Sequence, residues 1–204
     1  MTASDLFKVE YFLIIILKMK KGNKPVLKDF SLKFIDVMLG IVLGLGFQWW
    51  PDLIEPWQYI AFIFVYINLV DYWIDYSPTI KKFPLKREVD VLLHTFIIFS
   101  MFYLVFTTQS ESITTFLFAF IIYRVFDVTW IWRMSSEYNP NNYDKRFLSS
   151  WNLFDWIEIA FTATLAILVY FLSVNYLLII MLFILLRITT RIMASLRYKA
   201  VYFS

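Results

Sequence analysis

The sequence predicts an all-α fold: a polytopic membrane bundle of six transmembrane helices in three antiparallel hairpins. The 204-residue chain is 60% hydrophobic, which is far too apolar for a soluble core of this size. Its apolar residues also form runs of about 20 residues, which as helices cross a hydrocarbon core of about 30 Å. Spans must be helical because an isolated strand leaves its backbone groups unpaired in lipid.

The positive charges provide the third observation, because they fix the orientation. The predicted spans are 31–49, 57–76, 90–108, 113–132, 152–172 and 175–195. Of the 19 Lys and Arg residues, all but Arg124 lie on one side of the predicted membrane, either in the connections or, for Lys33, Arg187 and Arg191, toward the span ends on that side. Cytoplasmic loops hold the Lys and Arg excess, so we expect a multi-pass protein of the cell membrane with both termini in the cytoplasm.

The segment 1–30 does not have the order of a secretory signal, because its positive cluster follows its short apolar run. This pattern predicts an interfacial amphipathic helix on the inner leaflet, with a frayed terminus as the alternative. Residues 31–198 then form one transmembrane domain and 199–204 a cytoplasmic tail. The net charge of +3 therefore indicates contact with anionic inner-leaflet lipids and not with nucleic acid.

The connections differ in kind. Residues 48–57 are aromatic and acidic and contain two prolines, which suits a turn at the outer headgroups. Residues 173–175 are so few that helices five and six must be antiparallel neighbours. The longest connection, Met134 to Ser150, contains Asn-Pro-Asn-Asn and predicts a solvated cytoplasmic loop.

Helix one has a small-residue face at Gly40 and Gly44. Such a face lets another helix approach closely, which predicts that helix one lies centrally or at a subunit interface. The chain is then a homo-oligomer or a subunit of a membrane complex. The alternative is that glycine is simply common in membrane helices.

Ionisable residues at membrane depth are costly and mark candidate functional sites. Asp155 and Glu158 share one helical face, as do Arg187 and Arg191, so we expect ion pairs across the short hairpin. Arg124, the deepest charge, needs a carboxylate or a wet cavity. The alternative is that these residues snorkel to the inner headgroups. The predicted inner charge cluster is Arg124, Asp127, Asn152, Asp155, Glu158, Arg187 and Arg191.

Helix two carries Asn68, Asp71 and Asp75, whose spacing resembles the metal-binding carboxylates of membrane prenyltransferases. We treat these residues, with His94, as possible cation or head-group contacts. His94 is expected to bond a neighbour such as Asp90. One histidine and no cysteine predict no metal site, no cofactor and no nucleophilic catalysis.

The segment Phe147–Ile157, with its Trp151-Asn152 pair and Asp155, resembles the start of the third helix of voltage-sensor-type domains in cation channels. The resemblance implies a four-helix bundle over 90–198 whose inner charge cluster includes Asp127 and the two arginines of helix six. Those arginines lie only at the inner end, so voltage sensing is not implied.

Phe34-Ile35-Asp36 resembles the Phe-x-Asp start of the pore helix in prokaryotic relatives of the lysosomal potassium channel. Ile41 falls where that family places apolar pore residues, and those channels assemble as tetramers around this helix. The resemblance implies that Asp36, Gly40, Ile41 and Gly44 pack against other helices or line a pore.

Three functions remain open. The charges, the glycine face and both resemblances favour an ion-conducting or ion-sensing protein that acts as an oligomer. The alternative is a non-catalytic scaffold, sensor or effector subunit of a larger complex. An enzyme acting on lipid or isoprenoid head groups is the third, and the sequence leans against it.

The topology is directly testable, because the protein has no cysteine of its own. Single cysteines at Gln48 and Ser110 should react with an impermeant thiol reagent applied to intact cells, since both positions are predicted to lie outside. A cysteine at Asn141 should react only after the membrane is opened. Labelling of Asn141→Cys from outside would overturn the six-span prediction.

Overall fold

The computed structural model describes the backbone of residues 24–172 and 174–202 and the side chains of 33–172 and 174–196. This part of the chain is all-α and contains no strand. The elements are α2 (Lys24–Gly46), the 3-10 helix η1 (Phe47–Asp52), α3 (Pro56–Lys82), α4 (Glu88–Thr107), α5 (Ile113–Tyr138), α6 (Asn142–Phe171) and α7 (Tyr176–Tyr202). Most of the expected interfacial segment lies outside the described residues, but 24–30 are continuous with α2.

Five of the described helices, α2, α4, α5, α6 and α7, are long and apolar enough to cross a membrane. This confirms the all-α, membrane-spanning part of the predicted fold. The remaining helix, α3, has 27 residues, ample length for a span, but it is less apolar. Its C-terminal half carries Asp71, Asp75 and two lysines.

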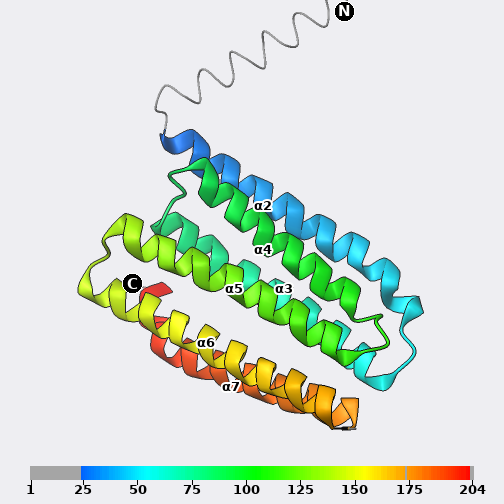
Figure 1. The fold of residues 1–204 in the computed structure, drawn as a ribbon. Coiled ribbons are helices and arrows are strands. Elements are labelled where there is room, and N and C mark those ends of the chain that lie inside the picture. The colour runs from blue at the N-terminus through cyan, green and yellow to red at the C-terminus, as the bar shows by residue number, and fades with distance from the viewer. Residues whose placement is uncertain (1–23, 173, 203–204) are drawn as a thin grey trace, which may run out of the picture.

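Consecutive helices run in opposite directions (Figure 1). The connections 83–87 and 139–141 therefore lie at one end of the bundle, here called the inner end, and the turns after α2, α4 and α6 lie at the outer end. Helices α3 to α7 form a ring in which each packs on the next and α7 packs back on α3. The packing is not confined to the predicted hairpins, since α5 packs most extensively on α6.

Aromatic side chains fill the outer half of this ring. The ring of Phe183 on α7 lies edge-on to Phe64 of α3 at 5.2 Å and to Phe116 and Phe120 of α5 at 5.6 and 4.7 Å. Such aromatic pairs contribute about 0.5–1.5 kcal/mol each beyond simple burial. Close packing of this kind is what holds helices together in lipid, where apolar burial alone does not. Aromatic packing of Phe183 therefore joins α3, α5 and α7 in the outer half of the bundle.

The predicted solvated loop between Met134 and Ser150 is wrong. Helix α5 continues to Tyr138 and α6 begins at Asn142, so three residues form the connection. Asn139 takes a left-handed conformation with φ 42°, and Asn141 caps α6 by accepting the backbone N–H of Asp144 at 2.8 Å. The Asn-Pro-Asn sequence thus marks only the turn. Lys82 then binds Asp144 at 2.6 Å and ties α3 to the start of α6.

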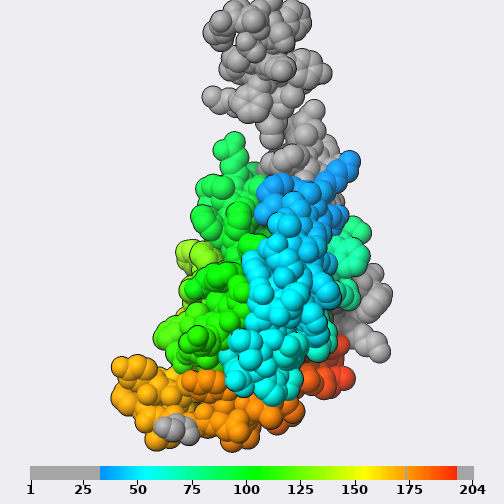
Figure 2. Space-filling model, turned by 90° about the vertical axis from the view of Figure 1, so that its right-hand side faces the viewer, coloured from blue at the N-terminus to red at the C-terminus, as the bar shows by residue number. Residues whose placement is uncertain are grey.

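Helix α2 lies at the edge of the bundle, against α3 and α4 (Figure 2, blue to cyan). Its outward face exposes Val37 and Ile41, and a Cβ placed on Gly40 or Gly44 would meet nothing within 4 Å. The predicted central position of helix one is therefore wrong for the single chain, and a subunit interface stays a prediction. Of the three glycines that the structure describes, Gly46 alone lies close to a neighbour: a Cβ placed on it would come within 2.9 Å of the Tyr66 hydroxyl.

Three glycine substitutions test this placement. Gly46→Leu should destabilise the protein by about 1–3 kcal/mol, because the added side chain overpacks a filled site. Gly40→Leu and Gly44→Leu should leave the melting temperature in detergent unchanged, since their surroundings are open. A similar loss in all three variants would contradict the edge position of α2. A change of particle mass in the Gly40 and Gly44 variants alone would assign this face to another subunit.

Candidate functional site

Charged side chains from α3, α5, α6 and α7 converge in the inner half of the bundle. We call this set the charge network: Asp71, Asp75, Arg124, Asp127, Asp155, Glu158, Arg187 and Arg191. Its member Glu158 lies about 20 Å along α6 from the outer end at Phe171, given the rise of 1.5 Å per residue. That depth is well inside a hydrocarbon core of about 30 Å.

Arg124 is the centre of the network. Its Nη1 lies 2.8 Å from Asp127 and 3.1 Å from Asp155, and its Nη2 lies 2.6 Å from Glu158. Only 2% of the Arg124 side chain is exposed. The guanidinium also lies 4.8 Å from the centre of the Tyr123 ring, within the range of a cation–π contact. One cation from α5 therefore joins its own helix to two carboxylates of α6.

Glu158 connects this centre to α7. Its Oε1 lies 2.8 Å from Nη1 of Arg187 and accepts the hydroxyl of Thr190 at 2.5 Å. Arg187 in turn donates to the side-chain oxygen of Asn68 on α3 at 3.2 Å and lies 3.6 Å from Asp71. A planar guanidinium with five donors suits such branching, which a lysine could not reproduce.

The network ends on α3 at a second pair of acids. Arg191 lies 2.7 Å from Asp71 and 2.5 Å from Asp75. About a quarter of the Arg191 and Asp71 side chains is exposed, whereas Arg124 and Glu158 are sealed. The contacts thus run from a buried centre between α5 and α6 to a partly exposed edge between α3 and α7.

The structure brings six of the seven predicted cluster residues together. Glu158 meets Arg187 as expected, but Asp155 pairs with Arg124, and Arg191 pairs with the acids of α3. Asn152 is not part of the network. It is half-exposed on α6, and its side-chain oxygen has no hydrogen-bond partner.

Sequence reasoning missed that helix two supplies acids to the network. A signal was available: Asp71 and Asp75 are four residues apart, as are Arg187 and Arg191, so two complementary helical faces could pair. These carboxylates bind arginines, and within the described residues no three His, Cys, Asp or Glu side chains are arranged to hold a metal ion. Their prenyltransferase-like spacing therefore does not correspond to a formed metal site.

The expected hydrogen bond of His94 to a neighbour is formed with Tyr72 and not with Asp90, which binds Arg133 at 2.7 Å. His94 is fully buried. Its ring lies 4.7 Å from those of Tyr76 and Trp130, with Nδ1 3.5 Å from the Tyr72 hydroxyl. It thus belongs to an aromatic group beside the network.

The remaining candidates lie on α2, away from the network. Asp36 is exposed and accepts the indole N–H of Trp73 at 2.9 Å. Gly40, Ile41 and Gly44 face outward. If they pack on another helix or line a pore, that contact involves another chain.

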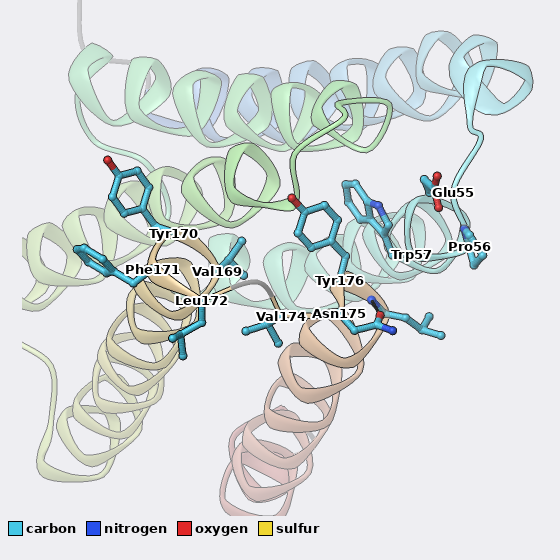
Figure 3. Close-up of a pocket in the computed structure, with 11 residues that line it drawn as sticks. Glu55, Pro56, Trp57, Val169, Tyr170, Phe171, Leu172, Val174, Asn175 and Tyr176 are labelled. Carbon is cyan, nitrogen blue, oxygen red and sulfur yellow. Dashed lines mark hydrogen bonds between the residues drawn. The ribbon is translucent and has the colours of Figure 1, made fainter.

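A small cavity inside the charge network and a larger hollow outside it are lined by different kinds of residue. A cavity of about 40 Å³ is lined by residues of the charge network together with Tyr76 and Trp130, which is room for ordered water. A larger hollow of about 800 Å³ lies at the outer end, between the start of α3 and the α6–α7 turn (Figure 3). Aromatic and aliphatic side chains such as Tyr170 and Trp57 dominate it, and it contains no member of the network.

In comparisons with family models, curated proteins and solved structures, nothing matches this chain. Its function is inferred here from the charge network.

The network predicts a strong energetic coupling between helices. Glu158→Gln should destabilise the protein by about 3–5 kcal/mol, because it leaves Arg124 and Arg187 short of a buried partner. In a double-mutant cycle with Arg124→Gln, the coupling energy should be about 1 kcal/mol or more. Unfolding in detergent measures both quantities.

The matched control for this cycle is Glu88→Gln, because Glu88 is an exposed acid in the first turn of α4, at the inner end of the bundle. That change should cost at most about 1 kcal/mol. A coupling of zero between Arg124 and Glu158 would show that the network does not hold α5 to α6.

Proposed function

We propose that this chain is a multi-pass integral membrane protein that senses or conducts cations, and that the charge network is its working part. One observation carries the proposal: Arg124 lies among three carboxylates at membrane depth, with 2% of its side chain exposed. Charges in membrane helices are rare and typically mark ion pathways, proton relays or sensors. Stability alone does not explain them, because apolar replacements of buried ion pairs are often neutral or stabilising.

The proposed topology has six spans, which are the five apolar helices named above and α3. Both termini lie in the cytoplasm. Helix α3 packs against α2, α4 and α7, which places it among helices apolar enough to span. Its two mid-helix acids are neutralised by Arg187 and Arg191, so the cost of placing them in the membrane is offset. The lysines and arginines of the connections gather at the inner end, as expected for a cytoplasmic face.

The geometry favours sensing over conduction by a single chain. The cavity within the network is about 40 Å³, room for ordered water but not for a column of ions. Binding a cation there, or losing one, would change the balance of ion pairs that join α3 and α7 to α5 and α6. A local change of charge is thereby coupled to helix packing, which is what a sensor requires.

The resemblance to voltage-sensor-type domains fits this proposal in part. An acid of α6 and an arginine of α7 belong to one inner cluster, as the resemblance implies. The central cation, however, is Arg124 of α5, and the arginines of α7 bind acids of α3. We therefore propose a charge-coupled bundle without voltage sensing.

A second role, as one subunit of an oligomer or larger membrane complex, is favoured by the outward face of α2. Val37, Ile41 and Leu45 are 45–61% exposed there, beside two glycines with open surroundings. This role is compatible with ion sensing, because a sensor must transmit its state to something.

The proposal predicts that the reconstituted protein responds to cations. In vesicles, replacing choline by Na⁺ or K⁺, or lowering the pH, should either drive cation flux or change amide hydrogen exchange in the inner turns of α3 and α7. Arg187→Gln should abolish the response because it removes the ion pair between α7 and Glu158 and leaves only the hydrogen bond of Thr190 between them. Glu88→Gln, at an exposed acid of α4, is the surface control and should respond as the wild type does. A wild-type protein indifferent to all three cations in both measurements would contradict the proposal.

A further inference from the structure

The charge network holds more acid than base, and we propose that its cavity binds one monovalent cation between Asp127 and Asp155. This inference deepens the proposed function and rests on it, since it names the ligand of the same network. It depends on three features: the surplus of carboxylates, two buried oxygens without partners, and a cavity that both residues line.

The surplus follows from the ion pairs. Five carboxylates face three guanidinium groups, so two negative charges are left over. Around the Arg124 guanidinium the imbalance is sharper, because three carboxylates share it and only Glu158 has a second arginine. An uncompensated charge is expensive in a membrane interior. At the open edge, water can solvate Asp71, whose side chain is 25% exposed, but Asp127 and Asp155 are sealed.

The unpartnered atoms locate the missing positive charge. Oδ1 of Asp127 and Oδ2 of Asp155 are buried and accept no hydrogen bond, and the two residues are 1% and 2% exposed. Their other carboxylate oxygens lie 2.8 and 3.1 Å from the same nitrogen, Nη1 of Arg124. The two carboxylates are therefore neighbours, each with one oxygen to spare.

The cavity supplies room beside these oxygens. Asp127 and Asp155 both line the space of about 40 Å³. Tyr76 and Trp130 line it as well, and the hydroxyl of Tyr76 and the indole N–H of Trp130 are buried without partners. A cation held by the two carboxylates could take the Tyr76 hydroxyl as a third ligand. A water on that cation could accept the indole N–H, which would satisfy all four atoms.

The chemistry favours a single positive charge over a divalent ion. Ca²⁺ takes six to eight oxygen ligands and Mg²⁺ requires octahedral geometry. Within the described residues no group of three acidic, histidine or cysteine side chains is arranged for a metal. A proton, Na⁺ or K⁺ accepts a site with two carboxylate oxygens, a phenol and water. All three share the charge that the site needs, and experiment can distinguish them.

Other titratable groups also face this pair, so its response to pH belongs to the whole neighbourhood. Arg124 and Tyr123 approach from α5, Glu158 from α6, Tyr72 and Tyr76 from α3, and Arg187 from α7. His94 of α4 lies behind Tyr72 and Tyr76. Substitution of the two aspartates themselves is therefore required to assign any effect to the site.

The test uses purified protein in choline chloride. NaCl or KCl is added in a calorimeter, and proton uptake is followed separately with a pH indicator. Asp127→Asn and Asp155→Asn keep the side-chain shape but remove one charge. Each should weaken cation binding by more than about tenfold, because a charged partner of the ion is lost. Asp52→Asn is the matched control, since Asp52 is an exposed acid at the end of η1, at the outer end of the bundle, and it should bind as the wild type does.

Heat from Na⁺ or K⁺ that both variants lose would identify a metal cation as the ligand. Proton uptake that both variants lose, without such heat, would identify the proton. A wild-type protein that binds none of the three, or variants that bind like the wild type, would overturn the inference, and the wild-type result is decisive even if a variant fails to fold. If the vesicle response persists in both variants, this inference fails while the proposed function stands. If the wild type binds a cation but vesicles do not respond, the proposed function fails and the site stands.

Discussion

A guanidinium group in the interior of a membrane must be paired, and the arrangement of the inner half of this bundle follows from that requirement. Arg124 is satisfied by one acid of its own helix and two of α6. Glu158 then needs Arg187, and the acids of α3 complete the pairing of α7. Four helices are thereby joined, and loss of Arg124 would leave the buried acids Asp127 and Asp155 without the cation that they share.

Different interactions join the helices in the outer half and in the inner half of the bundle. In the outer half, Phe183 and its aromatic neighbours pack by shape, and such packing tolerates small shifts. In the inner half, ion pairs require particular partners at particular distances. We therefore infer that a change of charge in the network would act on helix positions mainly at the inner end, where the helices are joined by these ion pairs. This division is the physical basis for proposing a sensor.

Much of the fold was predictable because lipid restricts the possibilities to few. Apolar length predicts the helices and their order along the chain, and the spacing of Arg187 and Arg191 correctly indicated a shared face. The orientation that the lysines and arginines indicate stays a prediction. Partner choice was not predictable in the same way. The choice of partner depends on which helices are neighbours in space. Arg191 and Asp155 therefore pair with residues that the spacing did not predict, and the side-chain oxygen of Asn152 has no hydrogen-bond partner. Likewise, burial of Gly46 but not of Gly40 follows from the edge position of α2, which spacing along one helix does not reveal.

The most direct test of this account is a density map of the protein in lipid nanodiscs, resolved well enough to place side chains and the bilayer. The account predicts Arg124 enclosed by Asp127, Asp155 and Glu158 in the inner half of the hydrocarbon layer, with Arg187 joined to Glu158. A map in which Arg124 reaches the headgroups or bulk water, or in which its three carboxylates lie apart, would contradict the central claim that a buried charge network organises this protein.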